Sequence, residues 1–222
     1  MSDTAEPATT AESICALCVQ TLGISSAALS IATRSGVRQL IASSDVRAAD
    51  MEDLQFTLGE GPNFDAIAGG SPVLVPDIAS KDECALERWP NFTDGVLAAG
   101  FHAVFAFPLH VGAFRFGALD LYRDAAGELT SLQISDALKA ADSATNALLE
   151  LERTMGGFDG TAVVTHHAQV HQAAGMVQVQ MGLGIREALL VLRARAYSDG
   201  VAISHLAIEV VARRLRFTPE DR

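Results

Sequence analysis

The chain has 222 residues, 49% of them hydrophobic and 19% charged, and its 16 Lys+Arg and 27 Asp+Glu give a formal net charge of -11. This length suffices for one full domain and one small one, and the hydrophobic content excludes an intrinsically disordered chain. No apolar run approaches the about 20 residues that a membrane helix needs, and the first residues lack the pattern of a secretory signal. We therefore expect a cytoplasmic protein without a membrane segment, in which residues 1–11 are disordered.

The segment from residue 12 to about 128 has the pattern of a mixed α+β domain. Apolar residues recur at helical spacing in some segments, and alternating residues rich in Val, Ile and Phe mark others as strands. The glycines and proline of GEGP at 59–62 predict a turn, after which Pro62 can start a helix. The expected elements, in chain order, are a helix over 13–22, strands over 27–33 and 39–43, a short helix over 62–68, a strand over 72–76, a helix over 90–99, and a hairpin of strands over 103–111 and 114–122.

Four segments in this region carry a family resemblance. They read GEGPNFDA at 59–66, VLVPDI at 73–78, RWPNF at 88–92 and FPLHVGAFRFGALDLYR at 107–123. Their order resembles the GAF domain, a small-molecule sensing or dimerising fold with a central antiparallel sheet and flanking helices. The resemblance implies a sensor for an unknown small-molecule or protein signal, and it names no ligand or cofactor. Asn63 and Phe64 stand where similar proteins often carry a cysteine, so a redox role for that turn has no support.

A long helical pattern follows this region, from Leu132 to Met155. Small or apolar residues recur at a 4-3-4-3 spacing, at Ile134, Leu138, Ala141, Thr145 and Leu148. Such a heptad-like seam is typical of a helix that pairs with its copy, so we expect a homodimer. The alternative is a helix that packs on its own sheet. Gly156 and Gly157 then break the pattern, and residues 156–164 are expected to form a short linker.

The last segment, residues 165–217, predicts three short amphipathic helices around one small core. Apolar residues recur at i, i+3, i+4 and i+7 in each of three runs, the mark of a helix with one buried face. Gly182 and Gly184 end the first run, and Asp199-Gly200 end the second. The residues expected in the core are Val170, Ala173, Val177, Met181, Ile185, Ala188, Leu189, Leu192, Ala196, Ile203, Leu206, Ala207, Val210 and Val211.

The order of residues in these three helices strongly resembles the ANTAR family of RNA-binding transcription antitermination domains. The matching residues are Gln172-Ala173, Gly175-Met176 and Gly182, then Glu187-Ala188, Leu192-Arg193 and Ala196, then Ala207 with Val210-Val211. Many family members place a lysine after the alanine of the first helix, whereas this chain has Ala174. That difference removes one cation from the first helix. The resemblance implies binding to paired stem-loops in nascent RNA, which would block a terminator hairpin. GAF domains in front of ANTAR domains are a recurrent pairing.

The second of these helices carries the residues whose chemistry best suits RNA. Arg186, Leu190, Arg193 and Tyr197 follow one stripe, and arginine beside an aromatic ring suits phosphates and unstacked bases. The competing interpretation is a solvated helix face whose arginines complement the helix dipole. A mid-helix glycine such as Gly175 indicates close approach of another backbone, either a packed helix or an RNA loop. The candidate RNA-binding residues are Gln172, Gly175, Met176, Arg186, Arg193, Tyr197 and Arg213.

The charge distribution separates this segment from the rest of the chain. Residues 1–160 hold 9 basic and 22 acidic residues, whereas residues 161–222 hold 7 and 5. A mildly basic segment beside an acidic one is consistent with RNA binding by the tail. Because the excess is small, it favours shape-selective binding over strong attraction to any nucleic acid.

Other combinations of reactive residues do not form a site in the sequence. Cys15 and Cys18 form a CxxC without a second pair, and they lie on an apolar helical stripe, which favours simple packing. Cys84 is a lone thiol. His167 and His171 are one helical turn apart without an acidic partner, so we expect no metal site. Four carboxylates are scattered without a nucleophile beside them, at Glu60, Asp65, Asp77 and Asp120. We expect no catalytic residues and no enzyme.

These patterns together predict a regulator with two parts. A GAF-like sensor with its helical extension, residues 12–155, would control an ANTAR-like RNA-binding domain at 165–217. One alternative is a DNA-binding regulator that uses the three helices as a helix-turn-helix. Its third helix would present Ser204, His205, Glu209 and Arg213, a poor set for reading bases. The other alternative is a ligand-binding GAF protein, or an enzyme, without nucleic-acid activity. The sequence leaves the sensor ligand, the target transcripts and the direction of the signal open.

Overall fold

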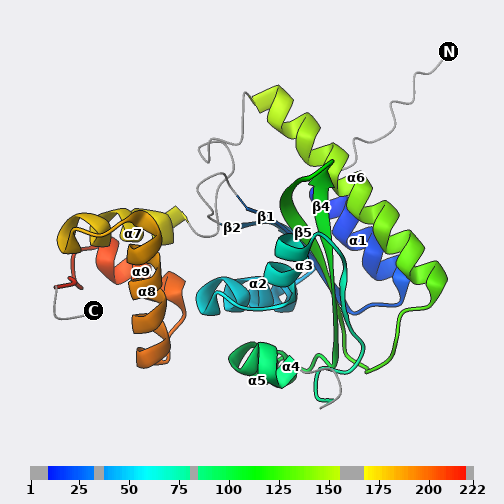
Figure 1. Ribbon diagram of the computed structural model, residues 1–222, viewed down its shortest axis with the longest axis horizontal. Coiled ribbons are helices and arrows are strands. Elements are labelled where there is room, and N and C mark those ends of the chain that lie inside the picture. The colour runs from blue at the N-terminus through cyan, green and yellow to red at the C-terminus, as the bar shows by residue number, and fades with distance from the viewer. Residues whose placement is uncertain (1–9, 33–37, 81–84, 156–167, 219–222) are drawn as a thin grey trace.

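A computed structural model describes residues 10–32, 38–80, 85–155 and 168–218. Within these residues one five-stranded sheet has the order β2-β1-β5-β4-β3, and every neighbouring pair is antiparallel. Its strands are β1 (Ser26–Ala32), β2 (Arg38–Ser43), β3 (Val73–Val75), β4 (Ala103–Val111) and β5 (Phe114–Arg123). Figure 1 shows helices on both faces of this sheet and a separate group of C-terminal helices beside one of them. This is the α+β architecture that the sequence predicts.

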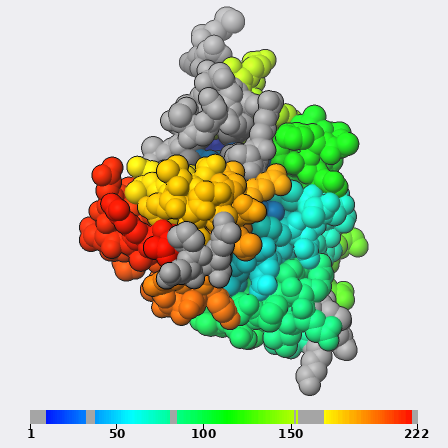
Figure 2. Space-filling view, turned by 60° about the vertical axis from the view of Figure 1, so that its left-hand side comes forward, coloured from blue at the N-terminus to red at the C-terminus, as the bar shows by residue number. Residues whose placement is uncertain are grey.

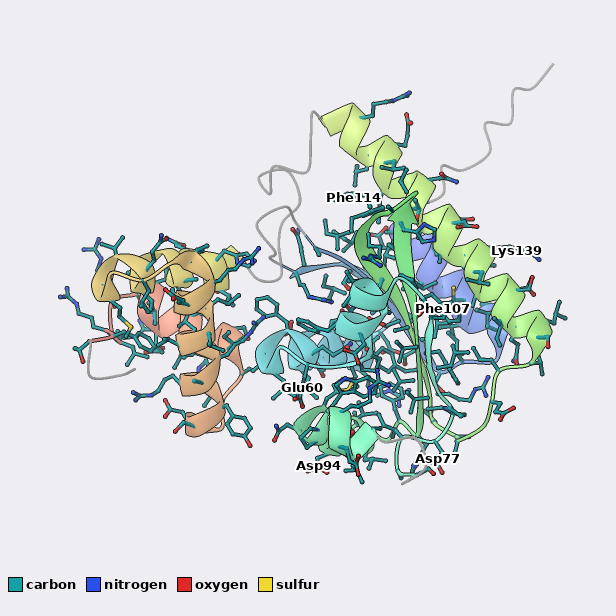
Figure 3. All side chains as sticks on the ribbon, in the orientation of Figure 1. Glu60, Asp77, Asp94, Phe107, Phe114 and Lys139 are labelled. Carbon is teal, nitrogen blue, oxygen red and sulfur yellow. The ribbon has the colours of Figure 1, made fainter. Side chains whose placement is uncertain are left out.

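The first face of the sheet is covered by α1 (Ala11–Leu22) and α6 (Ser131–Met155). Thr10 caps α1, because its hydroxyl accepts a hydrogen bond from the Ser13 backbone while the Ser13 hydroxyl accepts one from Thr10. The core on this face is mainly apolar and includes Cys15, Cys18, Phe105, Phe107, Leu119, Leu121, Ala141 and Leu148. Lys139 points outward from α6, away from the sheet (Figure 3).

The second face is covered by α2 (Val46–Leu58), α3 (Pro62–Gly69), α4 (Ala85–Arg88) and α5 (Pro90–Ala98). Asp45 caps α2 with one carboxylate oxygen, which lies 2.9 Å from the Ala48 nitrogen, and its other oxygen accepts a hydrogen bond from Ser26. The apolar core of this face is built around Trp89, Phe92, Phe101 and Tyr122. This face also encloses a connected group of polar side chains.

The C-terminal helices are α7 (Ala168–Met181), α8 (Ile185–Asp199) and α9 (Ile203–Val211). They pack together around a core of their own, which contains most of the residues expected there. Two of the expected residues differ: Ile185 is 38% exposed at the start of α8, and Val211 is only partly buried. Gly182 and Gly200 adopt the left-handed conformation at the two turns, as glycine at the end of a helix commonly does.

The N-terminal domain and the C-terminal helices meet at α2. Phe56 of α2 is only 2% exposed and belongs to the apolar core of α7, α8 and α9. Its ring meets that of His171 edge-on, with the ring centroids 6.0 Å apart. Figure 2 shows the C-terminal helices, in yellow to red, lying against the cyan and green surface of α2 and α5. The two parts therefore share a packed boundary.

The structure confirms each helix and strand expected from the sequence to within a few residues, apart from the positions that it does not describe. It also contains two elements, α2 and α4, that the sequence patterns do not predict. The expected linker at 156–164 and the turn around Ser35-Gly36 lie outside the described residues. The heptad-like seam of α6 is mostly part of the first-face core, since Ala141, Thr145 and Leu148 are buried there and Leu138 remains exposed.

Of the helices in the described part of the chain, none alone is both long and apolar enough to cross a membrane. The helices α7 and α8 reach that length and composition only as a pair, and they are bent by 105° at their break.

Candidate functional site

A cluster of buried polar side chains lies between the sheet and the helices of the second face. We call it the polar cluster. The alternation of strand residues points Ser30 of β1 and both Asp120 and Tyr122 of β5 toward this face. Helices α2 and α3 supply the other members. The cluster consists of Ser30, Glu52, Gln55, Asn63, Asp120 and Tyr122, each at most 6% exposed.

Asn63 is the centre of the polar cluster. Its Nδ2 lies 2.6 Å from Asp120 Oδ2 and 2.7 Å from Ser30 Oγ, and it lies 3.3 Å from Glu52 Oε2. Gln55 holds the backbone at this point, because its Oε1 accepts a hydrogen bond of 3.0 Å from the Asn63 nitrogen. The side chain of Asn63 is therefore held by β1, β5 and α2, and its backbone is held by α2 as well.

Tyr122 closes the other end of the polar cluster. Its hydroxyl donates to Glu52 Oε1 at 3.2 Å and accepts from Gln55 Nε2 at the same distance. Gln55 Nε2 also lies 3.2 Å from Glu52 Oε1. Glu52 and Gln55 are three residues apart on α2, which places both on the face of that helix that meets the sheet.

Several polar atoms around the cluster have no hydrogen-bond partner among the described residues, although they are buried. They are Asn63 Oδ1, Asp120 Oδ1 and Arg38 Nη1. A cavity of about 10 Å³ lies among Ser30, Arg38, Gln39, Glu52, Gln55, Phe56 and Asn63, with Leu40 and Phe64 completing its wall. That volume holds about one water molecule. Buried polar groups without partners are costly, so this cavity is suited to a water molecule or a small polar group that would bridge them.

The two carboxyl groups of the polar cluster are perturbed by their surroundings. Burial raises the pKa of Glu52 well above its usual value, and the nearby Asp120 carboxylate raises it further. Burial also raises the pKa of Asp120, although hydrogen bonds from Glu52 and Asn63 oppose this. Two carboxyl groups in one buried site resist ionising together, so we expect Glu52 to keep its proton near neutral pH.

Arg38 is the cation nearest to these carboxyl groups. Burial lowers its pKa to about 10, while Glu52 and Asp120 favour its charged form. Its guanidinium carbon lies 3.4 Å from the centroid of the Phe64 ring. Arg38 thus remains charged at neutral pH and forms the positive side of the cavity wall.

The GEGP turn positions Asn63, and its glycines are required there. Gly61 has a φ of +136°, and a Cβ at this position would meet Gln55 Oε1 at 2.3 Å. Only glycine therefore allows Gln55 to approach the start of α3. Pro62 then opens α3, as the sequence predicts.

The polar cluster offers groups that can hydrogen-bond a polar species. Its members offer carboxyl, amide and hydroxyl groups, and the described residues place no cysteine or histidine among them. Within the described part of the chain, no three His, Cys, Asp or Glu side chains gather in a way that could hold a metal ion. Buried carboxyl groups with raised pKa values are typical of functional sites and also of structural networks.

The candidate RNA-binding residues of α7 lie on its surface. Gln172 is exposed, and Met176 is half-buried against the core of the three helices. No atom of the described chain would come within 4 Å of a Cβ at Gly175. The expectation that Gly175 allows close packing of another helix of this chain is therefore wrong for the described residues. As far as the described residues go, the half-buried Gly175 leaves room for a partner from outside.

The candidate residues of α8 and beyond divide into two groups. Arg186 is exposed near the start of α8, and Arg213 is exposed just after α9, with a φ of 61°. Arg193 and Tyr197, by contrast, contact the N-terminal domain. Arg193 Nε donates a 2.8 Å hydrogen bond to the Phe56 carbonyl oxygen, and the Tyr197 hydroxyl lies 2.9 Å from Asn91 Oδ1. The structure therefore does not bring all the candidate residues together on one free surface.

The structure also decides the minor candidates. Cys15 and Cys18 are buried in the first-face core, and burial raises their pKa values to about 12 and about 11, as expected for packing residues. Cys84 and His167 lie outside the described residues. The description of Asp120 as a scattered carboxylate is wrong, because it lies in the polar cluster beside Glu52. The sequence does carry one signal of this buried site, a carboxylate between the apolar residues of a central strand. It carries no equally clear signal for Glu52, Gln55 or Asn63.

Comparison with known proteins agrees with this fold. The GAF domain of a phosphoenolpyruvate-protein phosphotransferase from Coxiella burnetii is 15% identical, with a TM-score of 0.52 over 66% of this chain and 83% of its own. A GAF domain from Synechocystis sp. PCC6803, solved in its photoproduct state, is 13% identical (TM-score 0.50, 64% and 93%). A GAF domain region from Geobacter sulfurreducens PCA is 14% identical (TM-score 0.50, 63% and 90%).

The family comparison covers the N-terminal domain. No curated protein matches the chain. Residues 6–148 match the GAF domain family, which is more than half of the sequence, and α7, α8 and α9 lie beyond the end of this match. The chain therefore belongs to the GAF domain family, whose members serve as sensor and ligand-binding domains.

Proposed function

We propose that this chain is a cytoplasmic, non-enzymatic regulator in which the GAF domain controls RNA binding by α7, α8 and α9. The RNA would be a pair of stem-loops in a nascent transcript, whose binding prevents a terminator hairpin. The observation that carries the proposal is that the ANTAR-like residue pattern falls on three helices with their own core. The apolar residues of this pattern, such as Ala173, Ala188 and Ala207, are buried, while its polar residues Gln172 and Glu187 are exposed.

The open surface of α7 supports the same proposal. Glycine in the middle of a helix destabilises it by about 1 kcal/mol relative to alanine, and the described chain offers no packing reason for Gly175. Close approach of an RNA backbone would explain it. Arg186 of α8, also exposed, supplies a cation for phosphate near one end of this helical unit.

The polar cluster is the proposed point where the GAF domain receives its signal. Its unpartnered atoms and its cavity provide hydrogen-bonding groups for a small polar species. A larger organic ligand would have to move α2 or α3 to enter. Because α2 also contacts the C-terminal helices through Phe56, the proposed signal reaches them by a short route.

A direct binding comparison tests the RNA-binding proposal. The full chain is titrated against a labelled RNA stem-loop pair and against duplex DNA of equal length at one fixed salt concentration, because nucleic-acid affinity depends strongly on salt. We expect tighter binding to the RNA. Arg186→Ala should weaken it by about tenfold, the size of one lost charge-assisted contact.

Arg115→Ala is the matched control, because Arg115 is also an exposed arginine but lies on the β4–β5 hairpin of the GAF domain. It should leave the RNA affinity unchanged. Equal losses in the two variants would mean that net charge and not the surface of α8 determines binding. Tighter binding to the DNA duplex would favour a DNA-binding regulator instead.

The DNA-binding alternative rests on α9. Its outward residues include Glu209, which forms a two-pronged ion pair with Arg214 at 2.7 and 2.8 Å. An acidic residue held in this way by a neighbouring arginine is a poor reader of base edges. This contact favours RNA over DNA as the proposed partner.

We also propose that the chain forms a homodimer, which would hold two RNA-binding units together for two stem-loops. Since Leu148 belongs to the core, the outward residues of α6 carry this proposal. Leu138 and Leu149 are 42% and 37% exposed and lie on one side of the helix. Replacing both by glutamate should halve the mass in sedimentation while the protein stays folded. A monomeric parent protein would contradict the proposed dimer.

A further inference from the structure

The contact between α8 and the GAF domain occupies the two side chains of α8 that best suit RNA. We call this the α8–sensor contact; it consists of Arg193 and Tyr197 on α8, and Phe56, Gly59 and Asn91 on the GAF domain. Besides its 2.8 Å hydrogen bond to the Phe56 carbonyl, the Arg193 guanidinium lies 5.1 Å from the centroid of the Phe56 ring. An interaction of this kind stabilises a cation over an aromatic ring.

Gly59 makes room for Arg193 at the end of α2. Arg193 Nη1 would lie only 3.3 Å from a Cβ at this position, so the guanidinium rests directly on the glycine. Arg193 is half-buried, and this burial lowers its pKa to about 10. A guanidinium that is covered by a helix end cannot reach a phosphate at the same time.

Tyr197 is held at the same boundary in a different way. Its hydroxyl donates a hydrogen bond to Asn91 of α5, but Tyr197 remains 62% exposed. A cleft of about 540 Å³ lies next to it, between α2 and α5 on one side and the end of α8 on the other. The ring is therefore near solvent, while its orientation is fixed by the GAF domain.

Phe56 connects this boundary with the interior of the GAF domain. It lines the cavity of the polar cluster, and it is also part of the core of the C-terminal helices. Gln55, directly before Phe56 on α2, and Glu52, one turn earlier, belong to the polar cluster. A movement of α2 that accompanied a change in the cavity would also displace the carbonyl and ring that hold Arg193.

We propose that the α8–sensor contact is autoinhibitory: it withholds Arg193 and Tyr197 from RNA, and movement of α2 releases them. This inference rests on the proposed RNA-binding function and adds its regulation. In the structure as it stands the chain is in the inhibited arrangement, with Gln172, Gly175 and Arg186 outside the contact. The released arrangement adds a guanidinium and an aromatic ring to that surface.

A reversible cross-link tests the proposal on the full chain. Asp94 of α5 and Ala202, just before α9, line opposite sides of the cleft, and neither is a candidate RNA-binding residue. Figure 3 labels Asp94 on α5. With Cys84→Ser as background, Asp94→Cys and Ala202→Cys are bridged by a bis-maleimide that carries a disulfide in its spacer. The native Cys15 and Cys18 are buried and should not react.

The bridged protein should bind the stem-loop pair at least about tenfold more weakly than the same sample after reduction of the spacer. The two single-cysteine variants, treated with the same reagent, should show no change on reduction. Equal affinity of the bridged and reduced protein would overturn the proposal. If the bridged, reduced and parent proteins all fail to bind the RNA, the RNA-binding function itself is refuted, and the inference falls with it.

A second variant loosens the contact from the GAF side without altering α8. Asn91→Ala removes the partner of the Tyr197 hydroxyl and should raise RNA affinity by roughly two- to tenfold. Asn146→Ala is the matched control, since Asn146 is an exposed asparagine on α6. Hydrogen exchange of residues 193–199 shows whether Asn91→Ala has loosened the contact. If these residues exchange faster while RNA binding is weaker or unchanged, the contact is not autoinhibitory.

Discussion

The two faces of the central sheet differ in what they bury. The face under α1 and α6 encloses mainly apolar side chains, whereas the face under α2 and α3 encloses the polar cluster. Among the described residues, it is the second face that packs against the C-terminal helices, through Phe56. The first face therefore mainly stabilises the domain, while the second face holds the polar groups at which we propose that the signal is received.

The largest expected effect comes from the apolar face. Leu148 is 1% exposed, and Leu148→Ala should lower the free energy of unfolding by about 2–5 kcal/mol, as for other buried leucines. Leu138→Ala, on the exposed side of the same helix, should cost much less. Urea denaturation followed by circular dichroism measures both. Similar losses would show that α6 does not divide into a buried and an exposed side.

The centre of the polar cluster should come next. Asn63→Ala would leave Asp120 and Ser30 without their shared donor, and unsatisfied buried groups cost about 1–3 kcal/mol. We expect a loss of stability of that order in the same denaturation experiment. Asn63→Ala with unchanged stability would mean that water replaces the amide without cost, and that the cluster is more open than its burial indicates.

The pH dependence of stability sharpens the comparison further. Since the pKa of Glu52 is raised in the folded state, the folded chain keeps a proton that the unfolded chain has released. Stability should therefore fall as the pH rises from about 5 towards 8, and Glu52→Gln should make this dependence flatter. The matched exposed variant Glu150→Gln should not. A parent-like slope for Glu52→Gln would show that Glu52 is ionised in the folded protein.

The smallest effect is expected at Gly175. Gly175→Ala should stabilise α7 by up to about 1 kcal/mol, because alanine favours the helix and the described chain leaves space for its Cβ. If RNA approaches this surface, the same variant should bind stem-loops more weakly. If the variant is more stable and binds RNA as tightly as the parent, Gly175 does not belong to the RNA-binding surface.

The sequence predicted the apolar framework well and the polar interior poorly. Apolar periodicity located the β4–β5 hairpin, α6 and the three C-terminal helices, because each repeats within a short segment. It missed α2, whose buried face carries Glu52 and Gln55, residue types that are ordinarily exposed. The heptad-like spacing of α6 predicts pairing with a second copy of this helix, whereas Leu148 is in fact buried in the core of its own domain.

The site was still harder to predict, because its members are distant in the sequence. Ser30 and Asp120 become neighbours only through the pairing of β1 with β5, and Asn63 reaches them from the start of α3. The partner of Arg193 is a backbone carbonyl, which every residue has, so no pattern of residue types marks the α8–sensor contact. Both features depend on tertiary structure alone.

The central claim is that RNA and the GAF domain compete for the same part of α8. Hydrogen exchange measured by mass spectrometry, on the full chain with and without a saturating stem-loop pair, tests this most directly. We expect slower exchange in α7 and α8 on RNA binding, together with faster exchange at 56–61 and 90–95, where the GAF domain loses its contact. Unchanged or slower exchange in those two GAF segments, with RNA bound to the C-terminal helices, would contradict it.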